Sequence, residues 1–233
     1  MRVSRRQAGK PIRAMASNRR MAAMVHFVFA GIFTVALYAF VHALRSMGSS
    51  FLSIVGTDST TLPWPTYLLY LLPLLPGMVL VAKGRHLLRR ARDADQGAQG
   101  EEDVARSLHD LPGLGWKLEY NVPLGGRLGD ADIVCTSPRQ RSYVIDVKSH
   151  RGDVFSDGQQ LFRRHMKQVK PFPKDFIGTA MKQALQLKQQ QQLRYVTPIV
   201  AFSDARISQQ PIYIRKVHVV EKSALGALLQ QLG

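Results

Sequence analysis

Two long apolar runs without a charged residue constrain this chain more than any other feature. Residues 22–44 and residues 62–82 contain no Lys, Arg, Asp or Glu. Each run is long enough to cross the hydrocarbon core of a bilayer, which takes about 20 helical residues. The sequence therefore predicts a hairpin of two transmembrane helices with a short external loop between them.

Basic residues flank these runs and indicate their orientation. Residues 1–92 carry 13 Lys or Arg and a single acid, with seven of the basic residues before the first run and five after the second. Because positive residues remain on the cytoplasmic side, both termini are expected in the cytoplasm of a multi-pass inner-membrane protein. Two alternatives stay open: the first run is a cleaved signal peptide, or both runs form a buried helical hairpin of a soluble protein.

The composition divides the chain into three parts. Residues 1–21 are a basic cytoplasmic segment, residues 22–92 are the membrane hairpin with its basic flank, and residues 93–233 are a cytoplasmic domain. This last part balances 19 basic against 15 acidic residues, as expected of a globular domain. The single cysteine, Cys135, excludes an intramolecular disulfide and a zinc site with paired cysteines.

Hydrophobic periodicity outlines the elements of residues 93–233. A helix with Val104, Leu108 and Leu111 on one stripe is expected to end at Pro112. Three strands follow, in "WKLEYNVPL", "DADIVCT" and "YVIDVKS", and the last two are expected to form a hairpin. After them come a helix over residues 176–193, strands in "TPIVAFS" and "KVHVVE", and a closing helix in "SALGALLQQL". This order predicts an α/β domain with a mixed β-sheet flanked by helices.

A charged pair stands inside the otherwise apolar stretch "YVIDVKSH". Side chains alternate across a strand, so Asp146 and Lys148 emerge side by side on the face opposite to Ile145. If the predicted hairpin forms, Asp132 of the preceding strand reaches the same face. Asp130, two residues earlier, would take that place if the register differed by two.

Two carboxylates and one ammonium at one place suit phosphodiester hydrolysis. Hard divalent cations such as Mg²⁺ prefer carboxylate and carbonyl oxygens, and a metal ion activates water and stabilises charge on a phosphoryl oxygen. The alternative is an exposed Asp–Lys surface pair, which contributes little energy. A basic run follows the pair and would suit phosphate contacts: Arg163, Arg164, Lys167 and Lys170.

Four segments in order resemble a known domain family. The segments are "GAQGEEDVARSLHDL", "GDADIVCTSPRQRSYVIDVKSHRGDV", "MKQALQL" and "VTPIVAFSDARI". Their order resembles the NERD (nuclease-related) domain, which is similar to the restriction-endonuclease-like group marked by Asp…(Asp/Glu)-x-Lys. The resemblance covers about residues 96–232 and implies a restriction-endonuclease-like core with cleavage of DNA or RNA through a metal-activated water.

The resemblance also assigns residues to roles. It implies catalytic roles for Glu101, Asp132, Asp146, Lys148 and Gln183, and it implies Mg²⁺ or Mn²⁺ held by Glu101, Asp132, Asp146 and the carbonyl of Val147. The sequence departs from the family at two positions. Asp146 stands where Glu is more frequent, and Ile133 stands where His is more usual, which removes one polar side chain from the expected site.

The function expected from the sequence is a membrane-anchored, divalent-metal-dependent nuclease. Its expected partners are the lipid bilayer and nucleic acid, with DNA as the first choice and RNA left open. A homodimer is an open alternative to a monomer. A second hypothesis keeps the fold without catalysis: a membrane-tethered module that binds nucleic acid or supports an assembly.

Overall fold

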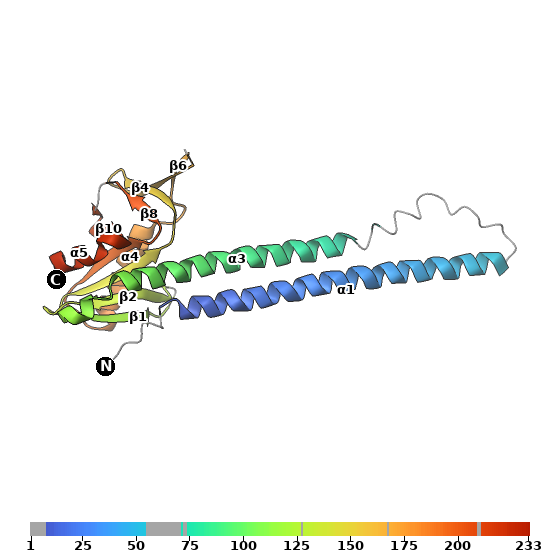
Figure 1. The fold of residues 1–233 in the computed structure, drawn as a ribbon, viewed down its shortest axis with the longest axis horizontal. Helices are drawn as coiled ribbons and strands as arrows, with labels where there is room; N and C mark the ends of the chain where they lie inside the picture. The colour runs from blue at the N-terminus through green and yellow to red at the C-terminus, as the bar shows by residue number, and fades with distance from the viewer. Residues whose placement is uncertain (1–7, 55–70, 72–73, 127, 167, 209–210) are drawn as a thin grey trace. The chain divides into compact units, whose positions relative to one another are not determined.

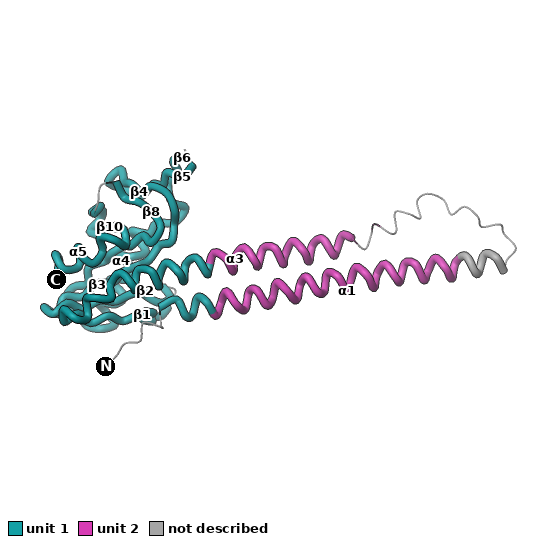
Figure 2. Tube along the Cα trace, viewed as in Figure 1, with its two compact units in different colours: residues 1–13, 94–233 teal, residues 14–93 magenta. Residues whose placement is uncertain are grey.

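The structure is a computed structural model that describes residues 8–54, 71, 74–126, 128–166, 168–208 and 211–233. The chain forms two compact units (Figure 2). Unit 1 combines residues 1–13 with residues 94–233, and unit 2 consists of residues 14–93. We describe each unit by itself.

Unit 2 pairs the long helix α1 (Lys10–Ile54) with the first half of α3 (Leu74–Ser107). Small residues recur every seven positions on both helices: Ala16, Ala23 and Ala30 on α1, and Gly77, Gly84 and Ala91 on α3. A Cβ on Gly84 would lie 2.7 Å from the Phe27 ring, and a Cβ on Gly77 would lie 2.5 Å from the Thr34 hydroxyl. The seven-residue spacing of small side chains thus lets the two helices pack closely, as in coiled coils and membrane helix pairs.

Helix α1 is long and apolar enough to cross a membrane. Its stretch Lys10–Gly48 contains an 18-residue window with a mean hydropathy of 2.1, and only 6% of that window is buried within the chain. Large apolar side chains such as Phe29, Ile32 and Val35 are exposed. This exposure argues against a buried hairpin in a soluble protein. Length and composition fit a membrane anchor or a signal sequence.

The second predicted span, residues 62–82, lies largely outside the described residues. Residues 62–70 and 72–73 are not described, and residues 74–82 belong to α3. Within the described parts of the chain, α1 is the one helix that meets the criteria for a membrane span. The described residues therefore contain one candidate span, and the prediction of two spans is not supported.

Unit 1 is built around a mixed six-stranded sheet, as the sequence predicts (Figure 1). The strand order is β1 (Lys117–Pro123), β2 (Asp130–Thr136), β3 (Ser142–Lys148), β7 (Val196–Phe202), β10 (Val217–Glu221) and β9 (Ile212–Ile214). Strands β1, β2 and β3 are antiparallel, whereas β3, β7 and β10 are parallel. The predicted hairpin of β2 and β3 is confirmed.

A second sheet of four strands is not predicted by the sequence patterns. Its order is β6 (Gln168–Pro171), β5 (Leu161–His165), β4 (Gly152–Ser156) and β8 (Ala205–Ile207). These strands are short and carry charged side chains among the apolar ones, so they lack a clear alternation of period two. In the sequence, residues 163–174 stand out only as a basic run.

Helices cover both faces of the main sheet. On one face, Val104 of α3 and Leu108, the residue after its end, pack with Ile133 and Ile145, and the 3₁₀ helix η2 (Leu111–Leu114) and α5 (Lys222–Leu232) join this cluster. On the other face, α4 (Phe176–Gln190) packs against Val144 and its neighbours. Val104, Leu108 and Leu111 are buried together as predicted, but α3 extends from Leu74 to Ser107, so it does not begin after residue 93 and does not reach Pro112.

Candidate functional site

The register of β2 and β3 brings the two predicted strand acids to one face. Ile133 pairs with Ile145, so the next positions outward, Asp132 and Asp146, share a side of the sheet. The Asp132 carboxylate accepts a hydrogen bond of 2.7 Å from the Val147 amide to its Oδ2. Asp130 is exposed and pairs with Pro123, so the register selects Asp132 over Asp130.

Asp146 and Lys148 form an ion pair at the end of β3. The Lys148 ammonium donates to Asp146 Oδ1 at 2.7 Å and to the Val147 carbonyl at 3.3 Å. Asp146 is only 3% exposed, and its Oδ2 has no hydrogen-bond partner within the described residues. The interpretation as an exposed surface pair is therefore wrong. A buried carboxylate oxygen without a donor is unfavourable and requires a further partner to satisfy it.

Helix α3 brings Glu101 close to these acids. Glu101 is 5% exposed, and its Oε2 accepts a hydrogen bond of 3.1 Å from the Gly9 amide. The preceding Gly100 lies against the ends of β3 and β7. A Cβ at this position would lie 2.8 Å from the Ser203 hydroxyl and 2.9 Å from the Ser149 Cβ. The absence of a side chain at Gly100 thus permits the helix to approach the strand ends.

Electrostatic interactions connect the three acids with Lys148. Burial raises the pKa of Glu101 to about 7; Asp146 raises it further, whereas the Gly9 amide and Lys148 act against the shift. Burial, followed by the charges of Asp146 and Glu101, raises the pKa of Asp132 to about 8, and Lys148 opposes this. Burial also raises the pKa of Asp146, against the effect of the Lys148 ammonium. A substantial fraction of Glu101 and most of Asp132 are therefore protonated near neutral pH unless more positive charge is supplied.

Gln183 of α4 lies buried below the same face. Helix α4 packs against β3 and β7, and Gln183 is 4% exposed beside Ala180 and Ala184 on the buried side of the helix. Its Oε1 has no hydrogen-bond partner within the described residues. A buried amide oxygen of this kind is free to accept a hydrogen bond from a water or from a rearranged donor.

The acids do not form a ready metal cluster. Among the described residues, no three acidic, histidine or cysteine side chains lie close enough together to hold a metal ion. The Val147 amide engages Asp132, Lys148 engages Asp146, and the Gly9 amide engages Glu101. The predicted residues thus lie in one electrostatic neighbourhood, with protein donors occupying part of their oxygens.

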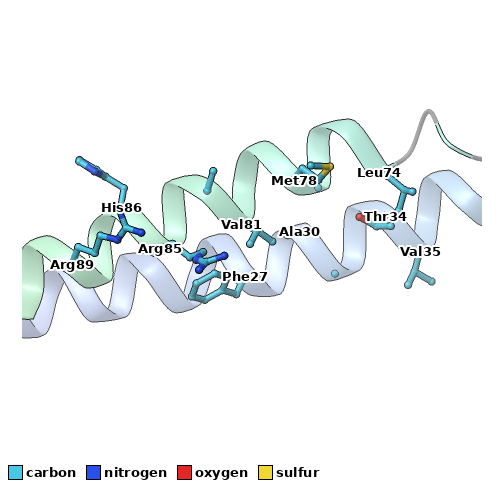
Figure 3. Close-up of a pocket in the computed structure, with 13 residues that line it drawn as sticks. Phe27, Ala30, Thr34, Val35, Leu74, Met78, Val81, Arg85, His86 and Arg89 are labelled. Carbon is cyan, nitrogen blue, oxygen red and sulfur yellow. The ribbon is translucent and has the colours of Figure 1, made fainter.

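Three of the four predicted phosphate-contact residues lie in the second sheet. Arg163 of β5 is half-buried, Arg164 and Lys170 are exposed, and Lys167 lies outside the described residues. A separate cavity of about 970 Å³ lies in unit 2 between α1 and α3 (Figure 3). It is lined mainly by apolar side chains together with Arg85, His86 and Arg89 and contains no carboxylate, so it offers no ligand for a hard metal ion.

Sequence reasoning missed three parts of this site. The Gly9 amide, which lies 92 positions before its partner Glu101, has no local signal in the sequence. Ser203 has a buried hydroxyl without a partner in the described residues, and its amide donates to the Lys148 carbonyl at 3.0 Å. His150 stacks on Phe176 with ring centroids 5.5 Å apart. Its position two residues after Lys148 is the one indication that the sequence offers.

These features define an α/β domain with a mixed sheet. A group of buried acids and one lysine lies at the end of β3, the strand that is antiparallel to β2 and parallel to β7. Residues 96–203 match the sequence model of the NERD family, described as nuclease-related domain. The chain therefore carries a nuclease-related domain over these residues, which include all five predicted catalytic positions. No curated protein and no solved structure gave a match to the chain.

Proposed function

We propose that unit 1 is a membrane-tethered nuclease that hydrolyses phosphodiester bonds of DNA, or of RNA, with the help of a divalent metal ion. One observation carries the proposal. Asp146 and Lys148 lie side by side at the end of β3, on the face shared with Asp132, and Asp146 is buried with an oxygen that no described donor satisfies. The nuclease-related match over residues 96–203 supports the reaction class, and we propose the restriction-endonuclease-like core for the same segment.

The oxygen donors of the site fit Mg²⁺ or Mn²⁺. The residues that would hold the ion are Glu101, Asp132, Asp146 and the Val147 carbonyl. A bound cation would account for three acids with raised pKa values and for the free Asp146 Oδ2, because hard divalent ions prefer such oxygens. When bound, the ion would lower the pKa of a coordinated water and stabilise charge on a phosphoryl oxygen.

The side chains would divide the remaining work. Lys148 favours the ionised form of Asp146 through their 2.7 Å contact, and its ammonium would donate to a phosphate oxygen or orient the attacking water. Gln183 would accept a hydrogen bond from a water through its unpaired amide oxygen. Burial of Asp146 and Gln183 excludes bulk water, which strengthens each of these interactions.

The contacts within unit 1 support a tether with an even number of membrane crossings. The Gly9 amide donates to Glu101, and the Arg13 guanidinium binds both oxygens of Glu102 at 2.7 and 2.8 Å. Residues 9 and 13 precede the apolar run 22–44, whereas residues 101 and 102 follow both apolar runs, so both ends must lie on one side of the bilayer. If α1 crosses, a second crossing is required, and we propose residues 62–82 for it, with both termini cytoplasmic.

A second candidate function follows from the absence of a ready metal cluster in the described residues. The domain would then bind nucleic acid or support an assembly without cleaving, and the acids would serve the fold. A nuclease and a nucleic-acid-binding module both predict binding of nucleic acid, but only the nuclease predicts strand breaks that depend on the metal.

The test uses the full chain of 233 residues, purified in detergent. Supercoiled plasmid, circular single-stranded DNA and structured RNA are incubated with Mg²⁺, with Mn²⁺ or with EDTA, and products are resolved on gels. We expect cleavage with metal only. Asp146→Asn and Lys148→Ala should each lower the rate roughly 100-fold or more, because each removes a group that interacts with the reacting phosphate or its metal.

Asp130→Asn is the matched control. Asp130 lies on the same strand as Asp132 but is exposed and pairs with Pro123, so the rate should stay within about twofold of the original chain. Cleavage that persists in both Asp146→Asn and Lys148→Ala would reject this site. Binding of DNA without cleavage under any metal condition would favour the non-catalytic candidate.

A further inference from the structure

The second sheet begins where the acid site ends. Three residues separate Lys148, the last residue of β3, from β4, and β8 follows closely after β7. Because β4 pairs with β8 in parallel, the second sheet continues from the ends of β3 and β7, where Lys148 and Ser203 lie. A nucleic-acid strand that reaches the acids would therefore meet the side chains of the second sheet next.

Strand register divides the basic residues of this sheet between its two faces. Arg163 pairs with Val154 on one side and with Lys170 on the other, so these three side chains share a face. Val154 is fully buried in the cluster that contains Phe176 and Phe202. The face of Arg163 and Lys170 is thus continuous with the side of the domain where α4 packs.

Arg164 belongs to the opposite face. It pairs with Asp153 and Val169, and its guanidinium carbon lies 5.6 Å from the centre of the Phe155 ring. Adjacent in sequence and identical in type, Arg163 and Arg164 therefore differ in the surface that they present. From the sequence alone, both are assigned to the same group of candidate phosphate contacts.

Aromatic rings connect Lys148 to Arg163. The Lys148 ammonium lies 5.3 Å from the centre of the Phe176 ring, and His150 stacks on that ring and lies 5.3 Å from Phe172. The Arg163 guanidinium carbon lies 5.9 Å from the centre of Phe172. Burial is the main cause that lowers the pKa of His150, and the charges of Arg163 and Lys148 lower it further, so its imidazole is neutral.

We propose that Lys148, Arg163 and Lys170, together with the partly exposed rings of His150 and Phe172, form a track that binds one strand of nucleic acid as it leaves the acid site. This inference rests on the proposed function and deepens it by naming a single strand as the bound form. Cations spaced along a surface neutralise successive phosphates, and aromatic rings stack on bases of any sequence. Paired bases within a duplex are not available for stacking of this kind, so the rings favour a single strand.

Binding without cleavage tests the track. The full chain is placed in zwitterionic nanodiscs with EDTA, which prevents metal-dependent cleavage, and a fluorescent single-stranded oligonucleotide is titrated by anisotropy over a range of salt. Replacing both Arg163 and Lys170 with Ala should weaken binding about tenfold or more. It should also reduce the slope of log K against log salt by about 0.7 for each phosphate contact that is lost.

Arg164→Ala is the matched control and should change the affinity less than about twofold, since it removes the same charge from the other face. His150→Ala should weaken single-strand binding about fivefold with little change in the salt slope, because it removes stacking and not a phosphate contact. Thermal unfolding of each variant verifies that unit 1 is folded.

Three results would overturn the track. The first is an equal loss of affinity in Arg164→Ala and in the double variant of Arg163 and Lys170. The second is equal affinity of the original chain for duplex and for single-stranded DNA. The third is a double variant that loses binding to phosphatidylglycerol vesicles but keeps its binding to DNA. Failure of the proposed nuclease function is distinguishable from failure of the track. A chain that never cleaves but shows the expected pattern of binding would support the track and contradict the proposed reaction.

Discussion

The three acids of the site are held in a state that disfavours their charge. Glu101 and Asp146 are nearly inaccessible to solvent, and among the described residues the Lys148 ammonium is the cation that interacts with the group. A raised pKa in the folded chain means that the fold binds these protons more tightly than the unfolded chain does. The contribution to stability is complete below the ordinary carboxyl pKa of about 4 and is lost as the pH rises through the folded values.

This sign leads to a pH-dependent prediction for the metal-free protein. With EDTA, the melting temperature of unit 1 should fall as the pH rises from about 6 to 9, through the pKa values of about 7 and about 8 for Glu101 and Asp132. Asp132→Asn removes one of these charges and should raise the melting temperature at pH 9 by roughly 2–4 °C, or about 1 kcal/mol for a domain of this size.

The measurement follows the fluorescence of Trp116, which is buried in unit 1, in a Trp64→Phe background so that one tryptophan reports. Asp130→Asn removes an exposed acid from the same strand and should give the pH dependence of the original chain. A melting temperature that increases steadily from pH 6 to 9 would show that the acids are already compensated in the folded chain, contrary to the proposed need for a cation.

At the scale of the elements, two glycines of α3 should respond in opposite ways to alanine. A Cβ on Gly97 would have no neighbouring atom within 4 Å, whereas a Cβ on Gly100 would meet Ser203 and Ser149 at less than 3.0 Å. Gly97→Ala should stabilise the helix by about 0.5–1 kcal/mol. Gly100→Ala should destabilise unit 1 by roughly 1–3 kcal/mol and lower cleavage, because it displaces the neighbouring Glu101.

Chemical unfolding monitored by Trp116 fluorescence compares the two variants, with cleavage measured in parallel. The pair controls for helix propensity, since both changes are Gly to Ala in one helix three residues apart. Equal effects on stability would mean that Gly100 is not at a close contact between α3 and the strand ends.

The elements that the sequence predicts correctly are those whose pattern is strong and local. The alternation in residues 130–136 and 143–149 predicts a hairpin, and the hairpin in turn places Asp132 beside Asp146. The second sheet escapes prediction because strands such as β5 mix Leu161 and Phe162 with Arg163 and Arg164, a pattern without a buried face of its own. In addition, β4 pairs with β8 across about 50 residues, which no window of sequence contains, and only the pairings of β4 with β5 and of β5 with β6 are local.

The site shows the same division between local and distant signals. Asp146 and Lys148 follow from the pattern of one strand, and Glu101 and Gln183 come from the family resemblance. The contact between the Gly9 amide and Glu101 joins residues 92 positions apart and has no signal in the sequence. The sequence also places Arg163 and Arg164 in one group, because the face of each depends on the register of β5 with β4 and β6.

At the scale of the whole molecule, residues 8–13, which include the first turn of α1, belong to the same unit as the nuclease-related domain, whereas the apolar run 22–44 belongs to unit 2. The Gly9 and Arg13 contacts with Glu101 and Glu102 require both ends of the intervening segment to be on one side of the bilayer. A single crossing by α1 is incompatible with those contacts. A two-span tether satisfies them, as does a chain in which α1 lies outside the membrane.

Cysteine accessibility in intact bacterial cells distinguishes these arrangements, since the one native thiol, Cys135, is buried. Thr57→Cys lies between the two apolar runs, and Gln99→Cys is an exposed position of α3 in unit 1. With two spans, a membrane-impermeant maleimide should label Thr57→Cys in intact cells and should reach Gln99→Cys only after lysis. Labelling of both in intact cells would mean one crossing and would contradict the Gly9–Glu101 contact. Labelling of neither, with extraction of the chain by alkaline carbonate, would mean that α1 does not cross a membrane.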